Sequence, residues 1–388
     1  MDKIKVAILG STGSIGIQTL DVIERHSDLF EVELLTANNS TDLLIEQAIK
    51  FEPNNVVICN HSNYKKVADS LSNHPVKVFA GIDSVCDLVK GDNVDIVVAA
   101  MVGFSGLKPT LAALSAGKNI ALANKETLVA AGAIVKEAAL KNSCAILPVD
   151  SEHSAIFQAI QGERSNIEKL LLTASGGPFL NSTIDEIKSA SLSEALNHPR
   201  WKMGAKVTID SASMMNKGFE MIEAKWLFDI TPDKIEIVVH PESIIHSMVQ
   251  FEDGSVMAQL SNPDMRLPIQ YALSYPYRLP LNTKRLDFAK IGALHFQSPD
   301  FQKFPCLRIA YESIGKGGNT PCAMNAANEV AVQALRDGEI AFWQIPLLIE
   351  KCLEKCSFIP NPTLDDIYST DFEAKNISQE LVKNINKW

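Results

Sequence analysis

Short apolar runs alternate with helical patterns through the first 150 residues. The runs read KVAILG, EVELLTA, NVVIC, VKVFA, VDIVVAA, KNIALA and CAILPV. Their nearly continuous apolar character is typical of strands covered on both faces, as in a parallel sheet with helices on either side. The pattern predicts an α/β fold class, with a doubly wound, Rossmann-like domain over residues 1–150.

The rhythm changes after residue 150. The runs EKLLLTAS, AKVTIDSAS and DKIEIVVH predict strands separated by helices, and SIIHSMVQFEDGSVMAQLS predicts two strands joined through Asp253-Gly254. We therefore expect an α+β domain over 151–275 and a Pro-rich, strand-poor linker over 276–300. Helical patterns dominate 301–388, as in CAMNAANEVAVQALRDG, where Gly338 is placed to end a helix.

Composition narrows the class of protein. The 388 residues are 46% hydrophobic and 21% charged, which suits a folded chain of roughly two or three domains. The net charge of −10 disfavours nucleic acid and anionic membrane surfaces as partners.

Targeting signals and cysteines predict a cytoplasmic protein. No apolar run reaches the length of a membrane span, and MDKIKVAILG enters a strand at once, so we expect no signal peptide. Seven cysteines without paired spacing indicate a reducing compartment. Cys352 and Cys356 lie one helical turn apart, which favours two buried thiols over a shared metal.

A glycine loop follows the first strand directly. VAILGSTGSIG places Gly10, Gly13 and Gly16 where backbone can approach a pyrophosphate, with the amides of the next helix pointing at its charge. In a doubly wound domain this pattern predicts dinucleotide binding, and a tight turn without a ligand is the weaker alternative.

The end of the second predicted strand bears on which dinucleotide binds. It reads LLTANNS and lacks the carboxylate that holds the ribose 2′-OH of NAD, so NADP is favoured. Asn38, Asn39 and Ser40 can donate hydrogen bonds there, or they form a solvated loop.

A pair of carboxylates follows the last strand of the first domain, in PVDSEH. In an extended segment Asp150 and Glu152 face the same side, and oxygen ligands of this kind suit Mg²⁺ or Mn²⁺. His153 is a further candidate ligand, and Glu220 or Glu223 could supply a third carboxylate unless both lie on a solvated face. The competing interpretation, in which Asp150 caps a helix with Glu152 in its first turn, is equally compatible with this motif.

Three polar segments follow, TASGGPF, NHPRWKMG and DSASMMNKGFE. Lys217 supplies a cation, and Ser175, Ser211 and Asn216 supply neutral hydrogen-bond donors. This combination predicts a phosphate site formed by the four residues. His198 and Trp201 lie in a loop that ends at Gly204, and a large aromatic side chain in a loop can exclude water from a site. Trp201 as a core anchor is the alternative, which aromatic base rates favour.

Together these motifs resemble the 1-deoxy-D-xylulose 5-phosphate reductoisomerase family, NADPH-dependent enzymes of the non-mevalonate isoprenoid route. The matching segments run in family order from residue 10 to about 255: GSTGSIG, ALANKETLV, PVDSEHSAIFQ, TASGGPF, HPRWKMG, DSASMMNKGFE and HPESIIHSMVQF followed by DGS. The helical tail fits as well. Jointly these motifs are highly specific, whereas the glycine loop alone is not.

The resemblance implies roles residue by residue. The implied ligands of one divalent ion are Asp150, Glu152 and Glu220. The implied substrate contacts are Lys125, Ser151, Glu152, Ser175, His198, Trp201, Ser211, Asn216, Lys217 and Glu220. The implied NADPH contacts are Thr12, Gly13, Ser14, Ile15, Asn124, Glu126 and Gly204, with Asn38, Asn39 and Ser40 near the 2′-phosphate. The implied catalytic residues are Lys125, Asp150, Glu152, His198 and Glu220.

The resemblance also implies the reaction and the assembly. The expected reaction rearranges and reduces 1-deoxy-D-xylulose 5-phosphate to 2-C-methyl-D-erythritol 4-phosphate, the segment 195–205 would be a mobile flap, and the hairpin would form a homodimer. Two departures from the family pattern stand out: Asn38-Asn39-Ser40 where Gly-Lys/Arg-Asn is frequent, and Arg200 where Asn or Thr is commoner.

Two rival functions make different demands on the sequence. A semialdehyde-type NADP dehydrogenase would commonly need a catalytic cysteine near a histidine, or a general acid/base, but no metal triad. None of the seven cysteines lies in a motif above. A dinucleotide-sensing protein without activity would have no need of three carboxylates and a phosphate cluster. Metal-dependent NADPH oxidation with the sugar phosphate distinguishes all three.

Overall fold

The computed structural model describes residues 2–201 and 203–385, which form two compact units. The first unit contains Met1–Thr127, Val135–Ser154 and Asp264–Asn282. The second contains Leu128–Ile134, Ala155–Pro263 and Thr283–Trp388. Each unit is assembled from three stretches of chain. The predicted domains, 1–150, 151–275 and 301–388 with a linker over 276–300, are each one continuous stretch, and this division stays a prediction.

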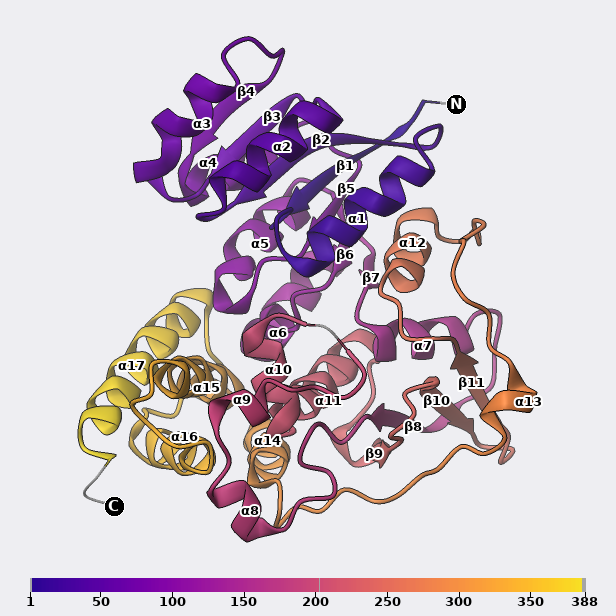
Figure 1. The fold of residues 1–388 in the computed structure, drawn as a ribbon, viewed down its shortest axis with the longest axis vertical. Helices are drawn as coiled ribbons and strands as arrows, with labels where there is room; N and C mark the ends of the chain where they lie inside the picture. The colour runs from indigo at the N-terminus through magenta and orange to yellow at the C-terminus, as the bar shows by residue number, and fades with distance from the viewer. Residues whose placement is uncertain (1, 202, 386–388) are drawn as a thin grey trace. The chain divides into compact units, whose positions relative to one another are not determined.

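The first unit is built on a parallel sheet of seven strands in the order β4-β3-β2-β1-β5-β6-β7 (Figure 1). The strands are β1 (Ile4–Leu9), β2 (Phe30–Ala37), β3 (Asn55–Ile58), β4 (Lys77–Ala80), β5 (Ile96–Ala99), β6 (Asn119–Leu122) and β7 (Ile146–Pro148). All seven predicted runs are confirmed as strands. The segment Val6–Leu9 of β1 is fully buried, as expected for a strand between two layers of helices.

The order of this sheet positions a binding crevice. The chain runs from β1 outward to β4 and returns to β5 on the other side of β1, so β1 and β5 are neighbours at the point where the order reverses. Ligands of open α/β sheets bind at the carboxyl ends of the strands at this point. The glycine loop follows β1 and therefore lies at this crevice.

Helices connect the strands of the first unit. They are α1 (Ser14–Arg25), α2 (Thr41–Phe51), η1 (His61–Asn63), α3 (Tyr64–Ser70), α4 (Gly81–Leu88), η2 (Gly103–Gly106), α5 (Leu107–Ser115), α6 (Lys125–Lys141), α7 (Ser151–Ala159) and α12 (Arg266–Ser274). The helix α12 is far away in sequence but packs on α1, where His26 Nε2 lies 3.0 Å from Gln270 Oε1 and Arg266 pairs with Asp21 at 3.1 Å. Part of α6, 128–134, and the end of α7 belong to the second unit.

The second unit has a four-stranded mixed sheet in the order β11-β10-β8-β9 (Figure 1). Its strands are β8 (Ile167–Ala174), β9 (Ile235–Val239), β10 (Ile245–Phe251) and β11 (Val256–Leu260). The predicted hairpin is confirmed: β10 and β11 are antiparallel, and Gly254 has φ +84° in the turn between them. This leaves β11 at one edge of the sheet.

Helices make up most of the second unit. They are α8 (Ile184–Lys188), α9 (Leu192–Ala195), α10 (Ala205–Ala212), α11 (Met215–Phe228), η3 (Pro232–Lys234), α13 (Phe288–Ile291), α14 (Pro305–Lys316), α15 (Thr320–Arg336), α16 (Gln344–Lys355) and α17 (Leu364–Lys383). The last three lie side by side at the yellow end of the chain in Figure 1. Gly338, with φ +76°, follows α15 where a helix end was predicted.

The run AKVTIDSAS is a helix, α10, and its prediction as a strand was wrong. The β-branched residues at 207–209 favour a strand locally. Folding favours the helix because Lys206 pairs with Asp210 one turn later at 2.7 Å, and Asn328 of α15 donates to the same carboxylate at 2.8 Å. Thr208 and Ile209 are buried on this helix, so long-range packing overrides local propensity.

Two further expectations concern strand-poor and membrane-spanning segments. Between 276 and 300 the structure has the short helix α13 and one isolated bridge from Gln297 to Val239, so the predicted strand-poor segment is confirmed. Among the described residues, every helix is too short or too polar to cross a bilayer. All seven cysteines are free thiols. Cys352 is buried, as predicted, but Cys356 is only partly buried, so the prediction of two buried thiols is correct for Cys352 alone.

Candidate active site

The glycine loop has a conformation that larger residues would disturb. Gly10 has φ +89°, and a Cβ there would lie 2.8 Å from the carbonyl oxygen of Ala100. A Cβ on Gly16 would lie 2.4 Å from the carbonyl oxygen of Gly10. Gly13, at the N-cap of α1, has no side chain to cover the helix end, and it is exposed together with Ser14. The first-turn amides of α1, beside Thr12 and Ile15, therefore have no side-chain cap at Gly13, as a helix end that receives an anion requires.

Side chains beneath the loop fix its position. Ser11 Oγ donates to Gln47 Oε1 at 2.7 Å, and Gln47 Nε2 donates back to the carbonyl oxygen of Ser11 at 2.9 Å. The amide of Gly10 donates to Thr36 Oγ1 at 2.9 Å. Ser11, Gln47 and Thr36 are all buried. Gln47 could not be predicted as a loop partner, because a single glutamine in an amphipathic helix gives no signal of a long-range contact.

The segment after β2 is exposed at all three predicted positions, Asn38, Asn39 and Ser40. Asn60 Nδ2 donates to Asn39 Oδ1 at 2.8 Å, so the segment is tied to the loop after β3. These three side chains are neutral, so they would not repel the charge of a 2′-phosphate. The preference for NADP therefore stays a prediction that the site does not conflict with.

Asn124 and Glu126 shape the crevice from the start of α6. Asn124 Nδ2 donates to the carbonyl oxygens of Met101 and Gly103 at 2.6 and 2.9 Å and to Glu126 Oε2 at 3.0 Å. Its Oδ1 accepts from the amide of Thr127 at 3.1 Å. Both predicted residues are buried, and through these bonds they hold the segment after β5 against the beginning of α6.

The predicted carboxylate pair lies beside a buried lysine. Lys125 Nζ is 2.5 Å from Asp150 Oδ2, and Ser151 Oγ donates to Glu152 Oε2 at 2.5 Å. Ligand oxygens of Asp150 and Glu152 lie within 4.8 Å of each other, although Glu152 is in the first turn of α7 and not in the extended segment from which their proximity was predicted. The lysine charge reduces the repulsion between the two carboxylates.

Asp150 also begins a helix, so the two interpretations of PVDSEH are compatible. Its Oδ1 accepts from the amide of Ser151 at 3.1 Å, and its carbonyl oxygen accepts from the amide of Ser154 at 2.8 Å. His153 is fully buried in α7, with a ring nitrogen within 4.8 Å of an Asp150 oxygen. A cap and a metal ligand can therefore be the same side chain, one oxygen serving each.

The first turns of α11 carry a buried group of opposite charges. Glu220 Oε2 accepts a hydrogen bond from Lys217 Nζ, and Glu220 Oε1 accepts from Asn216 Nδ2 at 2.5 Å. Lys217 and Glu220 are 5% and 1% exposed, and Glu223 is fully buried one turn later. The alternative that Glu220 and Glu223 lie on a solvated face is wrong. Buried charges need partners, so this group is suited to hold a cation, an anion or both.

The predicted phosphate residues come from two segments in close contact. A Cβ on Gly177 would lie 2.6 Å from the carbonyl oxygen of Ser211, so TASGGPF packs directly against the end of α10. Ser213 Oγ accepts from the amide of Met215 at 3.3 Å, and Met214 takes a left-handed conformation with φ +59°. This tight turn places Asn216 and Lys217 at the start of α11.

The hydrogen bonds of His198 indicate which ring nitrogen carries the proton. Its Nδ1 accepts from the amides of Arg200 and Trp201 at 3.2 and 2.9 Å, so the proton of the neutral ring lies on Nε2. That nitrogen is 3.1 Å from Ser175 Oγ and donates to it. Burial lowers the pKa of His198, which keeps the ring neutral near pH 7. Because Ser175 Oγ accepts this bond, its own O–H can donate to an anion.

The segment predicted to be a flap lies near a second histidine, His246. Trp201 is half-buried, its ring 6.2 Å from that of His246, so it is not the core anchor of the alternative interpretation. Arg200 Nε donates to the carbonyl oxygen of Pro241 at 3.1 Å. Gly204 is the N-cap of α10, and among the described residues other than its chain neighbours none has an atom within 4 Å of where its Cβ would lie. Lys202 of the flap motif lies outside the described residues.

His246 was not singled out from the sequence, although it lies in a quoted motif. It is buried in β10, and its Nε2 lies 2.9 Å from Ser261 Oγ. Burial lowers its pKa from the ordinary value of 6.5 to about 4. A second histidine at strand spacing, beneath a predicted flap, was the available signal.

We expect His246 to make the fold sensitive to acid. Because the pKa is lowered, between pH 4 and 6.5 the ring is mostly neutral in the folded state and mostly protonated in the unfolded chain. Its contribution is complete above pH 6.5 and is lost as pH falls to about 4, a change on the order of 3 kcal/mol. Urea unfolding at pH 7 and 4.5 should show a smaller loss of stability in His246→Gln than in the unmodified chain. An equal loss in both would remove His246 as the cause.

The sequence matches known protein families and relatives over most of its length. Family models match residues 6–132 (1-deoxy-D-xylulose 5-phosphate reductoisomerase), 146–228 (the C-terminal domain of that enzyme) and 260–377 (DXP reductoisomerase C-terminal domain). The 1-deoxy-D-xylulose 5-phosphate reductoisomerase of Bacteroides thetaiotaomicron is 57% identical over 382 residues, covering 98% of each chain. That of a Geobacillus species is 50% identical, covering 97% of this chain and 99% of the relative.

Solved structures agree with these matches. The Zymomonas mobilis reductoisomerase in complex with NADPH is 42% identical, with a TM-score of 0.91 over 98% of this chain and 99% of that one. A DOX-P reductoisomerase in complex with NADPH, fosmidomycin and magnesium is 39% identical, with a TM-score of 0.95 over 99% of both chains. With relatives this similar over its whole length, the chain belongs to the 1-deoxy-D-xylulose 5-phosphate reductoisomerase family.

Proposed function

We propose that this protein converts 1-deoxy-D-xylulose 5-phosphate to 2-C-methyl-D-erythritol 4-phosphate with NADPH and one divalent ion, Mg²⁺ or Mn²⁺. Identity above 50% over nearly the whole chain carries this proposal, and the buried pairing of lysines with carboxylates supports it. The direct experiment follows NADPH oxidation with the sugar phosphate, with and without Mg²⁺. Turnover that is unchanged by a chelator, or absent under both conditions, contradicts the proposal.

The residues present fit a hard divalent ion. Asp150, Glu152 and Glu220 would hold it through carboxylate oxygens, which are the ligands that Mg²⁺ and Mn²⁺ prefer. The bound ion supplies electrophilic stabilisation of negative charge on adjacent substrate oxygens. Lys125, next to Asp150, holds a proton that it can share with a substrate oxygen.

The substrate phosphate is assigned to the second unit. Lys217 provides a buried positive charge, and Asn216 shares the Glu220 carboxylate with it. Ser175 and Ser211 would supply further neutral donors. Because the phosphate takes no part in the bond changes, its binding energy is available to hold the substrate and favour a closed flap. His198 supports this site by fixing Ser175 Oγ.

The glycine loop and the start of α1 would hold the pyrophosphate of NADPH, which supplies the hydride. Thr12, Gly13, Ser14 and Ile15 offer backbone amides there, and Asn38, Asn39 and Ser40 face the position of a 2′-phosphate.

We expect Gln47→Leu to weaken NADPH binding by roughly tenfold, because the loop loses both bonds that hold Ser11. Glu46→Leu changes an exposed neighbour on the same helix and should leave the affinity unaltered. Fluorescence titration with NADPH measures both variants, and thermal unfolding shows whether they remain folded. Equal affinity in the two variants would mean that Gln47 has no part in positioning the loop.

We expect Trp201→Ala to reduce kcat/KM for the sugar phosphate by roughly tenfold, because a smaller side chain excludes water poorly from the closed site. NADPH affinity should stay within twofold, since the loop that binds pyrophosphate is unchanged. Steady-state kinetics with varied sugar phosphate measure the effect. Wild-type values would show that the indole only packs against His246.

A homodimer formed through β11 is part of the proposal. The strand lies at the edge of its sheet, and Val256 and Met257 are 45% and 47% exposed on it. Light scattering on the purified protein tests the mass. Seven free thiols support a reducing, cytoplasmic location.

A further inference from the structure

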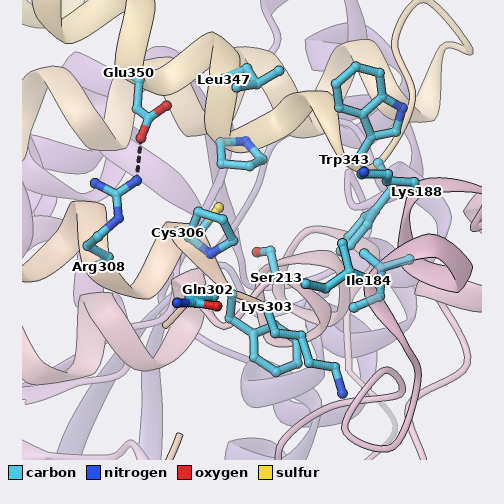
Figure 2. Close-up of a pocket in the computed structure, with 15 residues that line it drawn as sticks. Ile184, Lys188, Ser213, Gln302, Lys303, Cys306, Arg308, Trp343, Leu347 and Glu350 are labelled. Carbon is cyan, nitrogen blue, oxygen red and sulfur yellow. Dashed lines mark hydrogen bonds and ion pairs between the residues drawn. The ribbon is translucent and has the colours of Figure 1, made fainter. Parts of the chain in front are cut away.

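A cavity of about 400 Å³ lies in the second unit, and none of its lining residues is assigned above to substrate or metal (Figure 2). Three helical segments form its walls: α8, the start of α14 and the start of α16. Its volume lies within the range of small-ligand sites, roughly 300–1,000 Å³.

Apolar side chains dominate the lining and reach its mouth. Phe304, Phe342 and Leu347 line the interior. Ile184 and Trp343 also line the cavity, yet they are 47% and 37% exposed. Large apolar groups around a hollow, left partly open to water, are typical of a site that a ligand covers. The chemistry of this wall suits a hydrocarbon chain.

The charged residues of the lining favour an anion. The lining contains three cationic side chains, those of Lys188, Lys303 and Arg308, and one carboxylate, that of Glu350. The lining is therefore positive, although the whole chain has a net charge of −10. Arg308 Nη2 is 2.5 Å from Glu350 Oε1, so these two charges satisfy each other at one side of the cavity (Figure 2).

In Figure 2 Lys188 lies on the right and Lys303 below the centre, and both have hydrogen-bond donors to offer a ligand. Lys303 Nζ gives one hydrogen bond to the carbonyl oxygen of Leu180 at 2.6 Å, out of three that an ammonium can give. Lys188 Nζ is 3.8 Å from Asp185, an exposed pair of little strength.

The inner wall of the cavity touches the turn that carries the phosphate residues. Ser213 lines the cavity, and its Oγ accepts from the amide of Met215 at the start of α11. Asn216 and Lys217 follow directly. A molecule against Ser213 therefore contacts the back of this turn, and filling the cavity would restrict the movement of the turn.

From these contacts we infer that the cavity binds a small amphipathic anion, with its alkyl chain among the apolar side chains and its phosphate or carboxylate near Lys188 and Lys303. Occupancy is coupled to sugar-phosphate binding through Ser213 and the turn to Lys217. The coupling rests on the proposed function, whereas the binding site does not.

Octyl phosphate is a suitable probe, and Trp343 in the lining reports its binding by fluorescence. We expect saturable binding to the full-length protein, at least tenfold tighter than octanol, and no competition from inorganic phosphate. Leu347→Trp, which fills the cavity, and the double variant Lys188→Gln/Lys303→Gln should each weaken binding at least tenfold. Lys290→Gln, an exposed lysine outside the lining, should bind octyl phosphate as the unmodified chain does. Calorimetry repeats the measurement without relying on the indole.

Several outcomes overturn the inference. They are the absence of saturable binding, equal binding by the cavity variants and Lys290→Gln, and displacement by inorganic phosphate, which would place the probe in the substrate site. If Leu347→Trp instead changes the oligomeric mass, a second copy of the chain covers the cavity and the inference fails.

Coupling has its own measurement. Saturating octyl phosphate should shift the KM for the sugar phosphate at least threefold in the unmodified enzyme and leave it unaltered in Leu347→Trp. An unchanged KM with the probe bound overturns the coupling. Turnover without octyl phosphate tests the proposed function separately, so the two failures are distinguishable.

Discussion

Replacing Glu220 with glutamine is expected to lower kcat by about a hundredfold or more while leaving NADPH affinity within twofold. The substitution keeps the size of the side chain and its bond with Asn216, but removes the charge that is buried beside Lys217. Loss of one electrostatic stabiliser in an active site typically reduces the rate by about 10²–10³. The nucleotide should be unaffected, because its proposed contacts lie in the glycine loop.

The measurement combines steady-state kinetics with a titration of Mg²⁺ or Mn²⁺. In Glu220→Gln the metal concentration for half-maximal rate should rise as kcat falls. Glu223→Gln is the matched control, since Glu223 is equally buried and lies one turn further along α11. If Glu223→Gln loses activity and Glu220→Gln retains it, the third carboxylate ligand has been assigned to the wrong residue.

Replacing Lys217 with glutamine is expected to raise the KM for the sugar phosphate by about a hundredfold, with a smaller effect on kcat. Lys217 is 5% exposed, and removing one partner from a buried, hydrogen-bonded charge pair costs about 2–5 kcal/mol. Part of that loss falls on the fold, because Glu220 is left without its ammonium partner. Binding of the substrate phosphate would lose the buried ammonium group that is proposed to hold it.

Lys225→Gln, on the same helix, separates the two effects. Its ammonium lies over the ring of Trp226, 4.3 Å from the centroid, and takes no part in the proposed phosphate site. Kinetics with varied sugar phosphate should show a raised KM in Lys217→Gln alone, and thermal unfolding reports the loss of stability. A normal KM in a folded Lys217→Gln enzyme would place the phosphate elsewhere.

The sequence by itself determined the parallel sheet, the glycine loop, the hairpin at Asp253-Gly254 and the helix that ends before Gly338. Each depends on local properties: apolar runs that alternate with helices, and glycines where the chain takes a positive φ. The family resemblance depended on the same short motifs, which is why it could be stated before any coordinates. The proximity of the Asp150 and Glu152 oxygens was predicted for an extended segment, but the start of α7 is what brings them together.

Tertiary structure decided what neighbours far along the chain impose. It made α10 a helix, because Asn328 and Lys206 both bind the buried carboxylate of Asp210. It paired Gln47 with Ser11 beneath the glycine loop and buried Glu223 where a solvated face was also possible. It also formed the cavity from helices that are distant in sequence. A sequence pattern records which face of an element is buried, but the partner that covers that face is set by the fold.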